Sequence, residues 1–314
     1  MSTTALDLAT QPQDTEAARA VLRSQGRTFH FASRLLGQRH AERAAVLYGF
    51  CRHVDNLADE ADDPASARVA LDAVRRSLDT GHADDPWTAG LLSLRGSTGM
   101  SLAPALDLLA GVESDLSAVR LPDEAALVRY AYQVAGTVGL MMCTVLDVRD
   151  PRARPFAIDL GIAMQLTNIA RDIGEDARMG RRYVPASWIG DVEPADIASP
   201  DLDLQARLRV ATQRLLALAE RYYASGEAGL AFLPARARLA ILAAARMYRA
   251  IGAEVAASDF QSWDRRAVVG SLAKTGVTAH AALLFACSPR LHRCHAVHDA
   301  RLHDALRDWA NVGD

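Results

Sequence analysis

Two pairs of aspartates constrain this chain most, because each pair lies four residues apart within a largely apolar segment. Asp55 and Asp59 follow one apolar run, and Asp172 and Asp176 follow another. On an α-helix, residues four apart share one face and lie about 6 Å apart along the axis. Carboxylates are costly to bury without a partner, and bound cations remove that cost. The pattern therefore predicts a helical fold in which two acidic faces form a cation-binding pocket.

A single pair of this kind would usually be the solvated face of a helix, since charged residues are mostly exposed. The second pair and the apolar neighbours favour the pocket instead. Mg²⁺ prefers oxygen ligands, keeps several waters and is commonly shared with substrate phosphates. We therefore expect a site that holds a diphosphate through Mg²⁺, with Mn²⁺ as the alternative metal.

The rest of the sequence predicts helices almost throughout. Alanine, leucine and arginine are abundant and favour helices, whereas alternating β-branched residues are scarce. Glycine and proline clusters separate the predicted helices, which span 14–24, 28–37, 41–61, 64–79, 86–95, 101–113, 123–146, 151–179, 203–228, 234–258, 265–286 and 299–311. The longest predicted interruption covers 183–200, and a segment of that length within a compact domain indicates a functional loop or lid.

Composition excludes several classes of protein. The chain has 314 residues, half of them hydrophobic, which suffices for one large domain or two small ones. Its net charge of −3 gives no general basic field for nucleic acid, so we expect no nucleic-acid partner. Four cysteines without paired spacing indicate reduced thiols, and neither a signal peptide nor a membrane-spanning segment is recognisable. These features predict a cytoplasmic protein, either soluble or peripheral on the inner face of the membrane.

Several blocks of sequence resemble one known family. The second acidic motif, within 161–185, follows the signature of the squalene and phytoene synthases nearly throughout, and 48–59 follows their Tyr-x-x-Cys-Arg-x-x-Asp-Asp-x-x-Asp form. Further matching blocks lie at 132–139, 246–252 and 265–269. Together, in this order, they make the chain resemble the head-to-head prenyl synthases from about residue 25 to 275, and most of all the bacterial phytoene-forming members.

Two positions depart from the family pattern. Asn56 stands where the family usually has a second adjacent aspartate, which removes one negative charge and predicts weaker metal binding at most. Near the N-terminus, Gly26-Arg27-Thr28-Phe29 replaces a Ser-x-Ser-Phe run, so the first phosphate-contacting hydroxyl is missing.

The resemblance implies an all-α isoprenoid synthase fold with a central cavity. Its domain would cover 25–290, between a partly ordered N-terminal segment, 1–24, and a C-terminal helical tail, 291–314. The implied reaction joins two geranylgeranyl diphosphates through a cyclopropyl (prephytoene) diphosphate to 15-cis-phytoene in carotenoid biosynthesis. It releases two diphosphates and needs no NADPH. The implied partners are these substrates, the membrane surface and downstream carotenoid enzymes.

Other interpretations remain open. Within the family, the product could be squalene, presqualene diphosphate or dehydrosqualene, made from farnesyl diphosphate. Outside this chemistry, a non-catalytic relative or a class I terpene cyclase would retain a similar helical fold. Four of the five usual aspartates remain in the two motifs, which opposes the non-catalytic relative. The Tyr-x-x-Cys-Arg block and the Gly-Arg-x-Tyr-x-Pro tail oppose the terpene cyclase.

The resemblance also assigns roles to single residues. The expected metal ligands are Asp55, Asp59, Asn168, Asp172 and Asp176, and the catalytic set adds Tyr48 and Tyr248 to the four aspartates. The expected substrate-binding residues are Arg27, Thr28, Arg52, Gln165, Arg171, Tyr132, Tyr183 and Arg266. Salt bridges to neighbouring carboxylates are the alternative role for the arginines, and ordinary core packing is the alternative for the tyrosines. A cluster near the C-terminus, His292, Cys294, His295 and His298, could bind a soft metal, but an exposed helical tail is the preferred interpretation.

Overall fold

The computed structural model describes residues 32–309, and throughout this range the protein is all-α, as predicted. Its helices are α3 (Gln38–Asp59), α4 (Pro64–Thr80), α5 (Pro86–Thr98), α6 (Ala103–Ser114), α7 (Glu124–Ala131), the π-helix η1 (Tyr132–Gly136), α8 (Thr137–Val145), α9 (Ala153–Arg178), α10 (Ala186–Ile189), α11 (Pro194–Ala198), α12 (Leu202–Ala228), η2 (Gly229–Phe232), α13 (Ala235–Ala257), α14 (Ser271–Cys287), η3 (Pro289–His292) and η4 (Ala300–Leu306). Most predicted helices between 41 and 286 match these within a few residues.

Local chemistry sets several of these boundaries. The Asp63 carboxylate accepts hydrogen bonds from the first backbone amides of α4, Pro64 occupies the first helical position, and Gly81 ends the helix at φ 74°. Asp85 and Gly99 do the same for α5. An N-cap acid, an early proline and a left-handed glycine are the expected start and stop signals.

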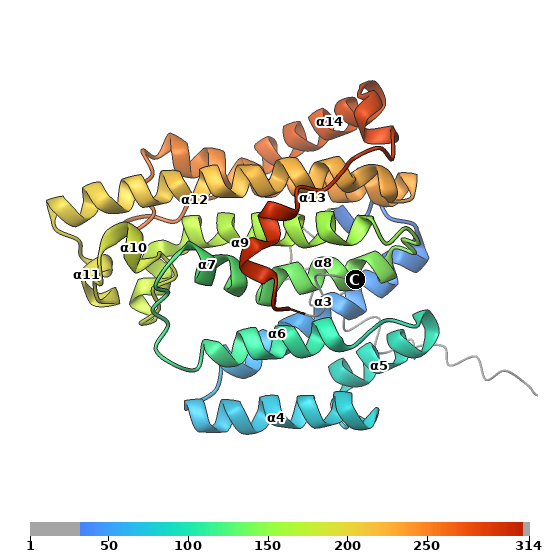
Figure 1. Ribbon diagram of the computed structural model, residues 1–314, viewed down its shortest axis with the longest axis horizontal. Helices are drawn as coiled ribbons and strands as arrows, with labels where there is room; N and C mark the ends of the chain where they lie inside the picture. The colour runs from blue at the N-terminus through green and yellow to red at the C-terminus, as the bar shows by residue number, and fades with distance from the viewer. Residues whose placement is uncertain (1–31, 310–314) are drawn as a thin grey trace, which may run out of the picture.

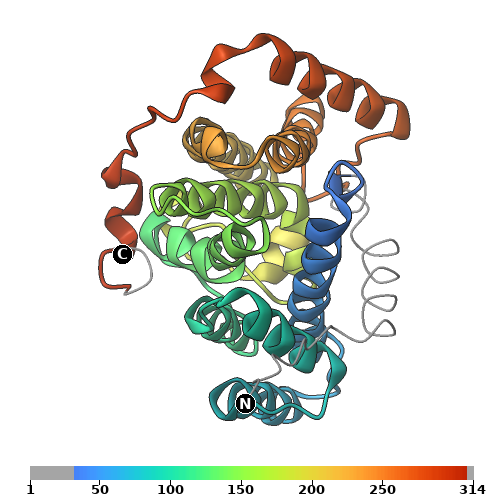
Figure 2. The same ribbon diagram turned by 90° about the vertical axis from the view of Figure 1, so that its right-hand side faces the viewer.

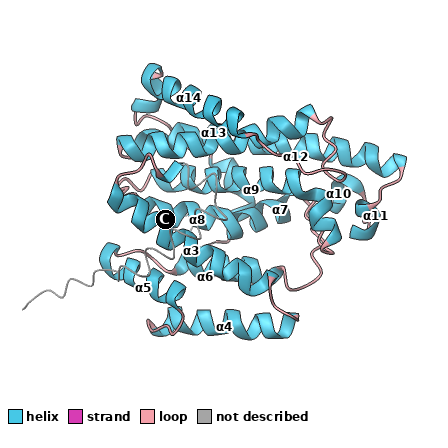
Figure 3. Cartoon of the chain, turned by 180° about the vertical axis from the view of Figure 1, so that it is seen from behind, coloured by secondary structure: helices cyan, strands magenta, loops and turns pink. Residues whose placement is uncertain are grey.

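Helix α9 lies at the centre of the molecule and packs against α8, α12 and α13. On one side α14 lies outside α13, and on the opposite side α4 and α5 form the outer edge (Figures 1 and 2). The view from behind shows the same stack of helices without a sheet (Figure 3). None of the helices in the described range is long and apolar enough to cross a bilayer.

Two glycines bring the backbones of neighbouring helices into close contact. A Cβ on Gly161 of α9 would lie 2.3 Å from the carbonyl oxygen of Ala135, and one on Gly139 of α8 would lie 2.1 Å from that of Ala157. Neither position tolerates a side chain without movement of backbone. Because both glycines also line the central cavity, this packing fixes the shape of the cavity wall.

The segment predicted as a loop, 183–200, contains two short helices, α10 and α11. Ile189 and Ile197 anchor it, and both are buried in the core. Just before it, the fully buried Arg182 reaches Asp191 at 2.8 Å. The sequence pattern did not predict these two helices because each is barely one turn long, too short for a helical repeat of apolar residues to show.

The C-terminal residues wrap around the helical body as short 3₁₀ segments, whereas the sequence predicted a regular helix over 299–311. Buried Asp159 of α9 accepts hydrogen bonds from Nε2 of His298 and of His303, both at 2.8 Å, and a third from the Ser225 hydroxyl. His298 is therefore a half-buried anchor and not part of an exposed tail.

The other members of the expected C-terminal cluster have separate partners. His292 contacts Arg238 at 2.9 Å, and the Cys294 thiol donates to the backbone carbonyl of Ala231 at 3.2 Å. His295 is exposed.

Replacing Gly161 with alanine should lower the free energy of unfolding by about 1–3 kcal/mol, because the new methyl meets a backbone carbonyl that cannot yield. The matched control is Gly96→Ala in α5, where nothing lies within 4 Å of the new Cβ. There the higher helix propensity of alanine should stabilise the protein slightly. Urea unfolding of both variants measures the contrast, and equal effects would contradict the close approach of α9.

Candidate functional site

A central cavity of about 580 Å³ lies between α3, α8, α9 and α13. Along α9 it is lined by residues from Ala153 to Arg171, which corresponds to about 27 Å of helix. Polar side chains gather at one end: Tyr48, Arg52, Asp55, Gln165, Asn168, Arg171, Tyr248 and Arg266. The remaining lining is almost wholly apolar, and includes Leu47, Met142, Leu146, Phe156, Leu160 and Ile241. The shape suits a molecule with a charged head and a long hydrocarbon tail.

Carboxylates crowd the polar end, which we call the acidic rim. Burial raises the pKa of Asp55 to about 7; nearby Arg52 opposes this shift, and Asp59 and Asp115 add to it. Burial, followed by repulsion from Asp172, raises the pKa of Asp176 to about 8. The two predicted pairs therefore face a common region and lack enough positive charge to offset them.

Two arginines pair with Asp172 at this rim. Its carboxylate accepts from Nε of Arg171 at 2.8 Å and lies 2.9 Å from Nε of Arg266. Arg266 also lies 3.2 Å from Glu175. Both arginines thus form the salt bridges considered for them, and both side chains also line the cavity.

One contact links the two acidic motifs directly. Arg181, just after α9, donates to Asp59 of α3 at 3.0 Å. Asp59 is the more exposed member of its pair, with a side-chain exposure of 37%. Of the predicted aspartates, Asp55 lines the cavity, whereas Asp59, Asp172 and Asp176 lie beside its polar end and outside the lining. Asp176 lines a small neighbouring pocket together with Arg181.

Asp115 also belongs to the rim, although the sequence did not point to it. It follows α6 and accepts hydrogen bonds from the hydroxyls of Tyr183 at 2.8 Å and Tyr130 at 2.9 Å. Burial raises its pKa to about 6, against the effect of those two bonds. Asp115 has no acidic partner four residues away, so only the fold places it beside Asp59.

The four tyrosines predicted at the site divide into two groups. Tyr48 and Tyr248 line the cavity, and burial raises the pKa of Tyr248 to about 12. Tyr132 and Tyr183 lie outside the lining. Tyr132 donates to Asp107 at 3.1 Å and begins the π-helix, which carries Val134 and Ala135 of the cavity wall.

Three side-chain amides lie in or next to the acidic motifs. Asn168 donates to Gln165 at 3.3 Å, and both line the cavity. Asn56, which replaces the usual aspartate, has a buried Oδ1 with no hydrogen-bond partner in the described part of the chain. Arg27 and Thr28 lie outside the described residues.

The rim fits a hard divalent cation. Its donors are carboxylate and amide oxygens, and burial together with repulsion from neighbouring carboxylates raises the pKa values of Asp55 and Asp176. Asn56, next to Asp55 in the sequence, has a buried amide oxygen without a partner among the described residues. A bound cation would relieve each of these costs.

Comparison with known proteins places the chain in a family. The squalene/phytoene synthase family model matches residues 22–273. A phytoene synthase of Cereibacter sphaeroides is 36% identical over 91% of this chain and 84% of its own length. A 15-cis-phytoene synthase of Enterobacter agglomerans is 38% identical over 76% of this chain and 85% of its own.

Solved structures show the same fold. A dehydrosqualene synthase crystallised with a ligand superposes with a TM-score of 0.78 at 26% identity, covering 87% of this chain and 97% of that one. A squalene synthase from Alicyclobacillus acidocaldarius gives a TM-score of 0.68 at 23% identity, over 81% of this chain and 98% of its own. With its cavity, acidic rim and matching sequence, the chain belongs to the squalene/phytoene synthase family.

Proposed function

We propose that this enzyme joins two molecules of geranylgeranyl diphosphate, through prephytoene diphosphate, to 15-cis-phytoene. The observation that carries the proposal is one cavity that runs from a polar end, lined by Asp55 and three arginines and flanked by the other acidic residues, to a long apolar chamber. The relatives named phytoene synthase, at 36–38% identity, support this product over squalene. No reductant is consumed in the route to phytoene.

The rim residues divide the task of handling the diphosphates. Asp55, Asp59, Asn168, Asp172 and Asp176 would hold Mg²⁺, or Mn²⁺ as the alternative. When bound, the metal supplies Lewis-acid stabilisation of the departing diphosphate. Arg52, Arg171 and Arg266 fork onto phosphate oxygens. Because Arg171 and Arg266 are already held by Asp172, the diphosphate exchanges one anionic partner for another at little reorganisation cost.

The chamber protects the cationic intermediates. Loss of diphosphate leaves an allylic cation that water would quench, and the apolar lining excludes water. Tyr48 and Tyr248 face this region and are close enough to interact electrostatically. Their rings stabilise positive charge through the π face. Raised phenol pKa values keep both hydroxyls protonated, so neither acts as an anion at neutral pH.

Product analysis tests the function directly. With geranylgeranyl diphosphate and Mg²⁺ the wild-type enzyme should form phytoene whether or not NADPH is present. Asp172→Ala should reduce turnover about a hundredfold or more, because it removes a metal ligand and the anion that positions two arginines. Asp304→Asn, at an exposed pair with Arg307, is the control and should retain activity. Preference for farnesyl diphosphate, or full activity in Asp172→Ala, would contradict the assignment.

Stability should depend on both pH and Mg²⁺. Because the folded pKa values of Asp55 and Asp176, about 7 and 8, exceed the unfolded value of about 4, the folded state binds more protons within this window. The free energy of unfolding should therefore fall as pH rises from about 4 to 8. Mg²⁺ favours the ionised carboxylates, so it should raise the melting temperature more at pH 8 than at pH 5.5.

Calorimetry of the wild type and of an Asp55→Asn, Asp176→Asn double variant provides the measurement. The variant should show a flatter pH dependence and a smaller Mg²⁺ effect. An equal Mg²⁺ shift at both pH values, or in both proteins, would argue against a metal at the rim.

We further infer that the α14 face contacts an anionic membrane surface, into which the hydrocarbon product can pass. Residues 265–298 contain no acidic residue, and Lys274, the only lysine of the chain, lies in α14. Val268 and Leu283 are 74% and 60% exposed. An apolar surface with basic charge and no acid suits interfacial binding to anionic lipid. Contact with downstream carotenoid enzymes stays a prediction.

Vesicle sedimentation tests the membrane contact. The wild type should bind vesicles containing phosphatidylglycerol and release them at high salt, and His280→Glu with Leu283→Asp, which are both exposed on one side of α14, should weaken binding about tenfold. Val69→Asp with Arg76→Glu, exposed on α4 at the opposite edge, is the matched control. Equal loss in both double variants would refute a specific face.

A further inference from the structure

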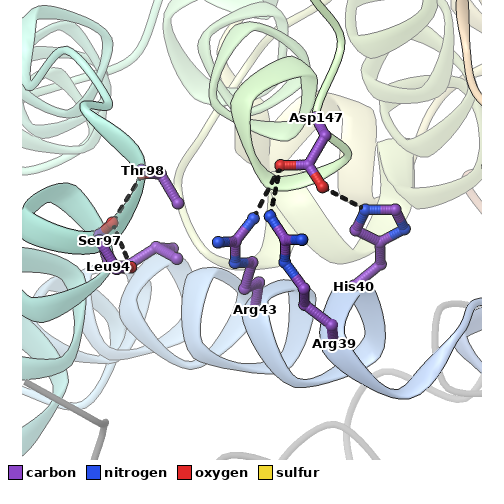
Figure 4. A network of polar contacts seen from close by, with 7 residues as sticks. All are labelled: Arg39, His40, Arg43, Leu94, Ser97, Thr98 and Asp147. Carbon is purple, nitrogen blue, oxygen red and sulfur yellow. Dashed lines mark hydrogen bonds and ion pairs between the residues drawn. The ribbon is translucent and has the colours of Figure 1, made fainter. Parts of the chain in front are cut away.

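The turn between α8 and α9 is fixed by an unusual concentration of positive charge around one carboxylate. Asp147 accepts from Nη2 of Arg39 at 3.0 Å, from Nε2 of His40 at 2.9 Å and from Nη1 of Arg43 at 2.9 Å. Figure 4 shows the three side chains, all from the first turns of α3, converging on Asp147 from below. We call this group the Asp147 clamp.

The backbone of the turn makes the choice of aspartate informative. The amide of Asp147 donates to the carbonyl of Thr144, and the amide of Val148 donates to that of Cys143. This pattern is a Schellman motif, in which glycine usually takes the left-handed position. Here that position is Asp147, with φ 56°. An aspartate in this left-handed conformation is less favourable than a glycine would be, but from this position its carboxylate reaches three side chains of α3.

The clamp is only partly shielded from water, since the side chain of Asp147 is itself 36% exposed. The side chains of His40 and Arg43 are only 19% and 16% exposed, whereas that of Arg39 is 67% exposed and contributes little. Burial acts to raise the pKa of Asp147, but hydrogen bonds from His40 and Arg43 outweigh it and hold the pKa below its usual range. Asp147 is therefore an anion, and α3 is held to the turn by charge-assisted bonds.

The clamped turn closes the apolar end of the cavity. Leu146 and Val148, on either side of Asp147, both line the cavity, as do Met142 and Cys143 one turn earlier. These residues lie with Ala153 at the start of α9, some 15 residues and about 23 Å of helix from Asn168 at the acidic rim. A chain whose diphosphate is held at the rim therefore reaches this wall only with its tail.

We propose that Asp147 is a specificity-determining residue, whose attachment to α3 holds Leu146 and Val148 as the end wall that selects a twenty-carbon over a fifteen-carbon chain. This inference rests on the proposed function. Close-packed walls discriminate chain length because an added or missing apolar group changes binding steeply. A fifteen-carbon tail ends before the wall, so only the longer substrate senses its position.

Paired variants test the clamp. Asp147→Gly removes the carboxylate and suits the left-handed backbone, and Asp147→Asn keeps the side-chain shape without the charge. In both, the ratio of kcat/KM for geranylgeranyl over farnesyl diphosphate should fall about tenfold, mainly through a higher KM for the longer substrate. Val148→Phe, which fills the chamber, should suppress the longer substrate and leave the shorter one.

The chain offers a closely matched control in Asp259. It also has a left-handed backbone, with φ 55°, ends α13 in the same hydrogen-bond pattern, and pairs with Arg209 at 3.1 Å, but it does not line the cavity. Asp259→Gly and Asp259→Asn should leave the ratio unchanged. A ratio within twofold of wild type in both Asp147 variants, or an equal loss with both substrates, would overturn the proposal.

Binding of unreactive analogues separates this inference from the function. Calorimetric titration with the fifteen- and twenty-carbon thiodiphosphates, in the presence of Mg²⁺, measures chain selection without turnover. The wild type should bind the longer analogue more tightly, and the Asp147 variants should lose that preference. If the preference appears but no phytoene forms, the proposed function fails and the end wall stands. If phytoene forms without the preference, the end wall fails.

Discussion

Repulsion among carboxylates at the mouth of a dry chamber is the constraint on which the structure depends. Asp55 and Asp176 carry raised pKa values because burial and neighbouring acids penalise their ionised forms. Burying several carboxylates close together lowers the stability of the folded protein. Arginines offset part of this cost at Asp172 and at Asp59. The remaining imbalance is what gives the site its affinity for cations and, through them, for diphosphate.

Helix α9 allows the charged and apolar halves of the site to be built from one element. Its C-terminal part carries Asn168 in the cavity lining and Asp172, which pairs with Arg171 and Arg266 of that lining. Its N-terminal part carries Phe156 and Leu160 in the chamber. Gly161 lets the π-helix approach α9 closely, and Gly139 of α8 does the same against Ala157, so both walls are packed backbone to backbone. A long straight helix thus fixes the distance between the diphosphate and the far end of the tail.

The sequence predicts those parts of the site that lie on one helix face. Helical spacing brought out Asp55 with Asp59 and Asp172 with Asp176, since residues four apart share a face whatever the tertiary packing, and the family resemblance added Asn168. Helical spacing did not bring out Asp115, which lies alone in sequence and gains its role when α6 ends beside α3. The C-terminal segment was predicted as a helix because its composition is helical, yet it follows the surface in short turns around the buried Asp159. In this segment the hydrogen bonds of buried Asp159 to His298 and His303 outweigh the intrinsic helix propensity of the residues.

Both ends of the cavity are built from carboxylates and basic side chains, but the ratio of acidic to basic groups is opposite at the two ends. At the rim, carboxylates outnumber the arginines that face them, so the site retains charge for a ligand to neutralise. At the Asp147 clamp, three basic side chains surround one carboxylate, and the turn is already satisfied. The side chains of the rim must exchange their ion-pair partners during each turnover, whereas the side chains of the Asp147 clamp keep theirs and resist movement. A rigid wall opposite an exchangeable rim lets the enzyme measure a hydrocarbon chain from the diphosphate that it holds.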